Sequence, residues 1–433
     1  MTAAIGFLMI VAIVALLLKG KMSPVVVLAA IPALAALILG FGLPDIMKFV
    51  ADGIGTTTSN GILFIFSVIY FGVLADTGLF DVIVNWLVKK AGNNVIAITV
   101  ATAIIATIAH LDGTTAVTVL ITIPSMYPVY KKMNIDERIL LCITGACMGV
   151  MNLLPWGGPT ARAATVLQMD ANDLWHMLIP IQVIGCIINI ALAVVMGMIA
   201  IKMGAGAGKG VEVESAQEEK KEDDGLRKGP KMLFFNFLLT AVVIAGLSVG
   251  IGKSYVVFLL GLCVLLAVNY PDQKTQQKLI KKHAPSAIAI SATLFAAGAM
   301  VGVFDGTGML EAMASAIMGI IPPALGQYIH IIFGLLALPL GLCIGTDAYF
   351  YGIMPLVMQV GETYGVASLN TAITMIIGKN LALMVSPLVP ATYLAIGLTN
   401  TELKDHMKFS IPPYYVTSVL MLFLGIVIGV VKL

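Results

Sequence analysis

The chain has 433 residues, of which 59% are hydrophobic and only 11% are charged, and its formal charge at pH 7 is +2. Soluble domains carry about 25% charged residues, so this composition cannot cover a surface that faces water and excludes an ordinary soluble protein. It predicts an all-α membrane protein, because an apolar helix satisfies its own backbone hydrogen bonds within lipid.

Apolar segments of the length needed to cross the hydrocarbon core recur along the whole chain. The predicted transmembrane helices, about ten in number, are 3–18, 23–42, 58–78, 137–153, 174–201, 232–250, 254–270, 284–304, 368–386 and 409–431. Two shorter stretches that carry charges, 79–91 and 305–320, are expected to lie as amphipathic helices at the membrane interface.

Two pairs of apolar arms interrupt this pattern, at 94–130 and 324–364, and each pair meets at a polar tip, at 110–115 and at 345–347. Each pair forms either a re-entrant hairpin or two full crossings. Both alternatives give the other loops the same sidedness, so the distribution of charge does not decide between them. The predicted fold takes both pairs as re-entrant hairpins.

A charged segment at 203–231 splits the chain into near-equal halves and is expected to be a flexible linker. Threading the spans alternately collects most lysines, together with this linker, on one side of the membrane, which is therefore assigned to the cytoplasm. The first hairpin is then expected on the cytoplasmic side and the second on the outer side. The expected location is the cell membrane, as a multi-pass protein.

The two halves share residues at a constant spacing of 232 positions. The matches are Gly113-Thr114-Thr115-Ala116 with Gly345-Thr346-Asp347-Ala348, Pro155 with Pro387, and Thr160 with Thr392. Because these matches coincide with the polar interruptions, they indicate an internal repeat.

The first repeat is predicted to cover 1–202, with three spans, the first hairpin, a broken helix at 137–168 and a span at 174–201. The second is predicted to cover 232–433, with further spans, the second hairpin, a broken helix at 368–398 and a last span. Each half has an odd number of crossings, so the second is inverted relative to the first. Inverted repeats with interrupted helices are typical of secondary transporters that bind solute at the midplane.

Four stretches cannot continue a helix at membrane depth: the two hairpin tips and the segments 152–160 and 386–390, which contain proline. Non-helical backbone is tolerated in a bilayer only where it lines a cavity, and the ends of half-helices suit carboxylates and cations. A packing kink is the alternative, but four symmetric breaks favour a binding site. The predicted substrate-binding residues are Asp112, Gly113, Thr114, Thr115, Asn152, Gly157, Gly158, Thr160, Arg162, Thr346, Asp347, Asn380, Ser386 and Thr392.

Charged groups within or beside apolar spans are few: Asp112, Arg162, Asp347 and Lys379, with His110 as a titratable neighbour. Each charge costs about 3 kcal/mol or more to insert, so each is a functional candidate. Arg162 is expected to grip a substrate carboxylate with its planar fork; the alternative is an ion pair with Asp112. Asp112 and Asp347 either ligate a divalent metal, accept a coupling proton or pair with the two cations. His110 is a further candidate for proton coupling, and Lys379 alternatively reaches to the membrane interface.

Three stretches carry a family resemblance: His110-Leu111-Asp112-Gly113, Met151-Asn152-Leu153-Leu154-Pro155-Trp156-Gly157-Gly158-Pro159-Thr160-Ala161-Arg162-Ala163, and Gly345-Thr346-Asp347-Ala348-Tyr349-Phe350-Tyr351-Gly352. In them the sequence resembles the citrate–divalent metal:proton symporters (CitMHS), a branch of the ion-transporter superfamily. The similarity in length and layout covers nearly the whole chain.

The resemblance implies import of citrate as a complex with a divalent cation of the Mg or Ca class, coupled to protons. It also implies an elevator-type homodimer in the lipid bilayer, in which hairpins and broken helices move as a transport domain past a scaffold domain. The chemistry agrees, because citrate carries about three negative charges at neutral pH and a bound metal removes two of them.

Other functions remain as alternatives. The nearest is a proton- or sodium-coupled symporter of another organic anion, such as a dicarboxylate or gluconate, without metal. A channel or cation transporter without organic substrate is a further alternative. The sequence contains no Gly-rich phosphate loop, nucleophile elbow or basic nucleic-acid patch, so neither an ATP-driven pump, an enzyme nor a nucleic-acid partner is expected.

Overall fold

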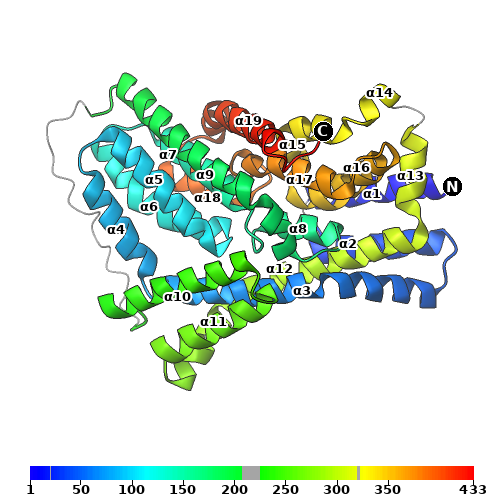
Figure 1. Cartoon of the computed structure of the whole chain (residues 1–433), viewed down its shortest axis with the longest axis horizontal. Helices are drawn as coiled ribbons and strands as arrows, with labels where there is room; N and C mark the ends of the chain where they lie inside the picture. The colour runs from blue at the N-terminus through cyan, green and yellow to red at the C-terminus, as the bar shows by residue number, and fades with distance from the viewer. Residues whose placement is uncertain (20, 207–224, 319–321) are drawn as a thin grey trace.

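The computed structural model describes residues 1–19, 21–206, 225–318 and 322–433, and the described chain is helical throughout (Figure 1). Its helices form two layers. The lower layer in Figure 1 consists of α2 (Pro24–Ile38), α3 (Leu43–Asp76), α10 (Pro230–Val249), α11 (Ser254–Asn269) and α12 (Gln273–Thr307). The upper layer contains α5 (Val95–Ala109), α6 (Thr115–Lys132), α7 (Glu137–Met151), α8 (Gly158–Val166), α9 (Ala171–Lys202), α15 (Ile329–Ile344), α16 (Met354–Thr363), α17 (Ser368–Lys379), α18 (Pro390–Thr399) and α19 (Leu403–Val427).

Four further α-helices lie beside these layers. α1 (Thr2–Lys19) packs against α2 and against α13 (Met309–Met318) at one end of the molecule. α4 (Leu79–Ala91) packs against α5 at the other end, and α14 (Pro323–Gly326) precedes α15.

A stripe of glycines brings α3 and α12 of the lower layer into close contact. Gly298, Gly302 and Gly306 repeat every four residues on α12, which puts them on one face. A β-carbon at Gly302 would lie 2.9 Å from Cα of Gly53 on α3, so only glycine permits this approach. Small residues at such spacing drive helix association in lipid, where backbones gain contact by approaching closely.

The order of helices in the first half recurs in the second. From α2 to α5 and from α7 to α9, each α-helix begins between 230 and 234 positions before its counterpart. For example, α8 begins at 158 and α18 at 390 (390 − 158 = 232), and α9 begins at 171 and α19 at 403 (403 − 171 = 232). The spacing is the one expected from the sequence matches. The repeat boundaries and the assignment of each layer to a domain remain predictions.

The predicted spans correspond to observed helices, with differences at their ends. Among the described residues, seven helices are long and apolar enough to cross a membrane, and α1, α2, α11 and α15 are shorter apolar helices. The span expected at 58–78 is the second part of α3, which begins 15 residues earlier, at Leu43 (58 − 43). The first part of α3 is too polar to be recognised as a membrane span from its hydropathy. Proline in its first turn and packing on α12 stabilise it as a helix.

The second predicted hairpin and interfacial helix also differ at their boundaries. α15 begins at Ile329 rather than near 324, because the short helix α14 precedes it. The stretch expected at 305–320 is divided by Gly308, whose φ of +65° ends α12 before α13 begins. Residues 319–321 of this stretch, and 207–224 of the predicted linker, lie outside the described residues.

A candidate substrate site at two hairpin tips and two broken helices

The four predicted breaks are all irregular in the structure. The first tip is a 3-10 turn, η1 (His110–Asp112), followed by Gly113 with φ +73°, and the second turns at Gly345 with φ +71° into a π-helix, η2 (Ala348–Ile353). The first broken helix is interrupted between α7 and α8, and the second passes through a 3-10 segment, η3 (Asn380–Val385), between α17 and α18. The two broken helices cross closely, since a β-carbon at Gly149 would lie 2.9 Å from Cα of Leu381.

The first tip is fixed against the first broken helix. The indole Nε1 of Trp156 donates to the carbonyl of Leu111 at 2.6 Å, and a β-carbon at Gly113 would lie 2.7 Å from the carbonyl oxygen of Trp156. Nε2 of His110 lies 3.2 Å from Oδ1 of Asn152, and its Nδ1 lies 2.6 Å from the hydroxyl of Thr118. His110, Thr118, Asn152 and Trp156 are all buried, so the first tip and the first break form one unit.

Asp112 is satisfied within its own tip. One carboxylate oxygen accepts from the amide of Thr114 at 2.9 Å, and the other accepts from the Thr114 hydroxyl. An ion pair between Arg162 and Asp112 was one expected alternative for Arg162, and the structure does not form it. The reason is that the neighbouring loop already supplies donors to Asp112, whereas Arg162 faces the other tip.

Arg162 binds the second tip instead. Its Nε donates to Oδ1 of Asp347 at 2.6 Å, and the two side chains are 20% and 24% exposed. The neighbouring Gly158 leaves space for this arginine, because a β-carbon there would lie 2.7 Å from Nη1. The ion pair uses Nε, and no hydrogen bond to a described residue uses either Nη atom. Both Nη atoms of the guanidinium therefore remain available to donate hydrogen bonds to a carboxylate of a ligand.

Lys379 joins the second tip to the second broken helix. Its Nζ donates to the hydroxyl of Thr346 at 2.8 Å and lies 5.1 Å from the ring centroid of Phe350. The residue is only 1% exposed. The alternative in which Lys379 reaches to the membrane interface is therefore wrong, because the break places the end of α17 inside the protein.

Several buried polar atoms near these breaks have no partner among the described residues. They are Nδ2 of Asn152, both Nδ2 and Oδ1 of Asn380, and the hydroxyl of Tyr351. Buried polar groups are almost always hydrogen-bonded, to protein, water or ligand. These unpartnered atoms lie near two tips that carry charged side chains, as is expected of a site that receives a polar ligand.

The remaining predicted site residues mainly support the backbone of the breaks. Thr160 donates to the carbonyl of Asn152 at 2.9 Å, and Thr392 donates to the carbonyl of Leu383 at 3.4 Å. Ser386 donates to the carbonyl of Leu342 at 3.4 Å, and Thr115 begins α6. Gly157 is enclosed, since a β-carbon there would lie 2.5 Å from the carbonyl oxygen of Asn152.

Tyr351 is a functional candidate that the sequence reasoning did not single out. It is fully buried and lies four residues after Asp347, on the same face of a helical turn. That spacing is the sequence signal from which it could have been found.

For the predicted metal ligands Asp112 and Asp347, the described residues contain no group of three or more His, Cys, Asp or Glu side chains that could hold a metal.

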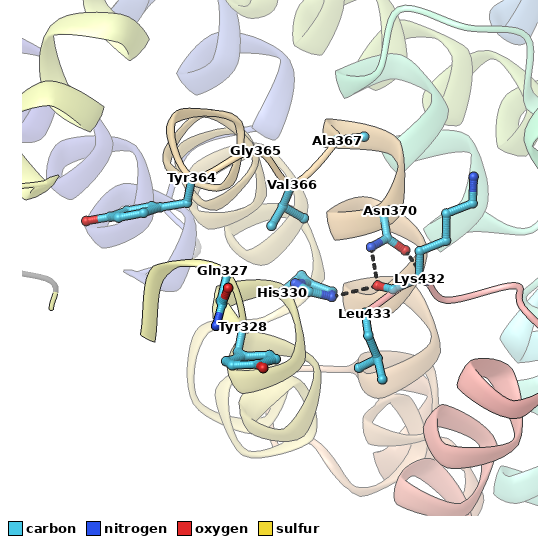
Figure 2. Close-up of a pocket in the computed structure, with 10 residues that line it drawn as sticks. All are labelled: Gln327, Tyr328, His330, Tyr364, Gly365, Val366, Ala367, Asn370, Lys432 and Leu433. Carbon is cyan, nitrogen blue, oxygen red and sulfur yellow. Dashed lines mark hydrogen bonds between the residues drawn. The ribbon is translucent and has the colours of Figure 1, made fainter. Parts of the chain in front are cut away.

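Two cavities lie outside the four breaks. The larger one, about 550 Å³, is at the base of the second hairpin, where His330 and Asn370 bind the carbonyl of Lys432 at 2.9 and 2.6 Å (Figure 2). None of its lining residues is a predicted site residue. The smaller one, about 220 Å³, is bordered by Val166 and Pro355, each one helical turn beyond Arg162 and Tyr351 respectively. Neither Arg162 nor Asp347 lines this cavity.

Fold and site together define a class of protein. Interrupted helices and paired hairpin tips, repeated in inverted halves of an all-helical membrane protein, are the architecture of a secondary transporter. The YdaH transporter of Alcanivorax borkumensis has a similar fold, with a TM-score of 0.62 over 90% of each chain at 14% identity.

Sequence comparison gives the family. The sequence model of the citrate transporter family (CitMHS) matches residues 7–378. Two proteins of Bacillus subtilis (strain 168) match over the full length of both chains: a citrate transporter at 32% identity and an Mg(2+)/citrate complex secondary transporter at 34% identity. The chain belongs to the citrate transporter family and is a multi-pass protein of the cell membrane.

Proposed function

We propose that this protein imports citrate as a complex with a divalent metal ion, coupled to protons. The metal is part of the substrate rather than a resident cofactor. The relative that transports an Mg(2+)/citrate complex supports a magnesium-class cation. The resemblance first noted at the tips and breaks supports the same substrate.

The observation that carries the proposal is the balance of buried charge at the breaks. Two cations, Arg162 and Lys379, stand against two carboxylates, Asp112 and Asp347. Free citrate would bring about three negative charges into this nearly neutral surrounding, at high desolvation cost. A divalent metal cancels two of them, and the remaining charge is small enough for the polar groups of the breaks and a proton to balance.

Within this proposal each group has a role. The Nη atoms of Arg162 bind one citrate carboxylate while Asp347 holds its Nε in place. The orphaned amides of Asn152 and Asn380 supply further hydrogen bonds. Asp112 and Asp347 face the metal or the coupling proton, and His110 is a second candidate for the proton.

Transport is proposed to follow an elevator mechanism in a homodimer. The upper layer carries both tips and both broken helices and acts as the transport domain, and the glycine-packed lower layer acts as the scaffold. The close packing of α3 on α12 supports a rigid scaffold.

The test is uptake of labelled citrate by the purified protein in liposomes, with and without Mg²⁺ and with the outside more acidic than the inside. We expect uptake to require metal and to rise with the pH gradient. Equal uptake in metal-free buffer rejects the complex as substrate. Uptake driven by a sodium gradient, or competition by malate or gluconate without metal, instead favours a symporter of another organic anion.

A further inference from the structure

Lys379 is a buried cation for which the described residues supply no carboxylate. None of the ion pairs among them includes it, and its one hydrogen bond goes to a neutral hydroxyl, that of Thr346. Asp347, the acidic group of the same tip, is already bound to Arg162 at 2.6 Å. A buried ammonium with three donors and one acceptor is costly, so a further acceptor is expected when the site is occupied.

The position of this ammonium is built into the fold rather than accidental. The stem of Lys379 lies along α15, where a β-carbon at Gly341 would lie 3.1 Å from its Cγ. Its Nζ then meets the tip at Thr346 and the face of Phe350 on the returning arm. The side chain thus contacts both arms and the tip of the second hairpin, and glycine at 341 makes the room.

The geometry separates two cations on either side of one tip. Arg162 approaches Asp347 from the first broken helix, and Lys379 approaches Thr346 from the second. A ligand seated at this tip therefore meets two positive groups from different directions. A polycarboxylate satisfies both at once, whereas a smaller acid leaves one of them unpaired.

We propose that Lys379 is a specificity-determining residue that binds a second carboxylate of the substrate, distinct from the one held by Arg162. This inference rests on the proposed function and extends it. On binding, the ammonium gains the substrate carboxylate as an acceptor. The consequence is selection for tricarboxylates over dicarboxylates, because only the larger acid reaches both cations while it also holds the metal.

The experiment compares citrate with malate, a hydroxy acid that lacks one carboxylate arm. Binding of each to the purified protein is measured in Mg²⁺ for the wild type, K379M, K379Q and the control T374V. Thr374 lies on the same helix and donates to the carbonyl of Asn370, away from the tip. Loss of one well-placed charged contact changes affinity by about 10- to 100-fold.

We expect K379M and K379Q to weaken citrate binding by about 10- to 100-fold and malate binding by less than about threefold, so that the preference for citrate collapses. T374V is expected to keep both affinities. If both neutral variants leave the ratio of the citrate and malate affinities unchanged, Lys379 does not bind the second carboxylate. K379Q keeps a polar end and serves as the readout if K379M does not fold. Failure of the wild type to bind citrate would reject the proposed function instead.

Discussion

At the scale of single residues, two adjacent glycines in the first break have different tasks. Gly157 is enclosed by backbone, because a β-carbon would lie 2.5 Å from the Asn152 carbonyl oxygen. Gly158 borders a side chain, because the nearest atom to its β-carbon would be Nη1 of Arg162 at 2.7 Å and the guanidinium carbon is 4.0 Å away. Backbone cannot yield, whereas the end of a flexible side chain can. The same small change thus has different consequences at neighbouring positions.

We therefore expect G158A to fold normally but to bind citrate about tenfold more weakly, because the displaced Nη1 belongs to the fork proposed to hold a carboxylate. G157A is expected to reduce the yield of folded protein, because the break itself cannot form. Citrate binding and thermal unfolding of the purified variants check both. Unchanged affinity in folded G158A would show that the Nη atoms of Arg162 do not contact the substrate.

At the scale of elements, one asparagine connects the two layers. Asn60 of α3 is 1% exposed; its Nδ2 donates to the carbonyl of Met169 at 3.0 Å, and its Oδ1 accepts from the amide of Ala171 at 2.9 Å. The side chain of Asn60 thus forms one hydrogen bond with each end of the segment from Met169 to Ala171, which joins α8 to α9. Gln168 of the same loop donates to Asp305 of α12. The loop after the first broken helix is held by the lower layer at three points.

The equivalent loop between α18 and α19 lacks such contacts in the described residues. Its hydrogen bonds stay within the upper layer, from Tyr127 to the carbonyl of Thr399 and between Thr399 and Thr401. α8 packs on both α3 and α12, whereas the packing of α18 is on α6, α7, α19 and η3. The two repeated halves therefore make different contacts with the lower layer in this structure.

Removing the Asn60 clamp is expected to release the loop between α8 and α9. N60A leaves two buried backbone groups unpaired, at a cost of about 1–3 kcal/mol each, which disfavours the docked loop. We expect a cysteine placed at Ala171, which is fully buried, to react at least about fivefold faster with a thiol reagent in N60A than in the parent, because opening becomes more frequent. The control is S291A, which removes a bond between α12 and Gly61 within the lower layer. A labelling rate unchanged by N60A would mean that this loop does not move.

The elements that could be predicted from the sequence are those that depend on local properties of the chain. The helices were located by hydrophobic length, and the breaks by proline and glycine that forbid a helix, as at Pro155 and Pro387. These are local properties. The polar start of α3 and the clamp by Asn60 were missed, because both are stabilised by partners far away in the sequence, such as Met169, 109 positions on.

At the scale of the whole molecule, the elevator proposal requires the layers to slide. Two cysteines in place of Gln168 and Asp305, whose side chains are hydrogen-bonded across the layers, provide a test with a short reversible bifunctional thiol reagent. Cross-linking is expected to stop citrate uptake while binding persists, and reduction is expected to restore uptake. The exposed Cys263 and Cys343 are first replaced by alanine.

A matched pair within the lower layer controls for modification itself. Asp76 of α3 and Lys282 of α12 form an ion pair at 2.6 Å, so cysteines at these positions join two parts of the proposed scaffold. We expect their cross-linking to leave uptake nearly unchanged. Full uptake by the cross-linked Gln168–Asp305 variant would rule out sliding of the layers along this contact.

The sequence by itself determined the membrane class, the order of helices, the repeat spacing and the four breaks, since each depends on composition or on neighbouring residues. It also named the ionisable residues of the candidate site, because charge in an apolar span is conspicuous at any position. Only the tertiary structure decided how these charges pair. Arg162 meets Asp347 across 185 positions rather than the nearer Asp112, and Lys379 turns inward to Thr346. Pairing depends on which segments approach in space, and no local property of the chain contains that information.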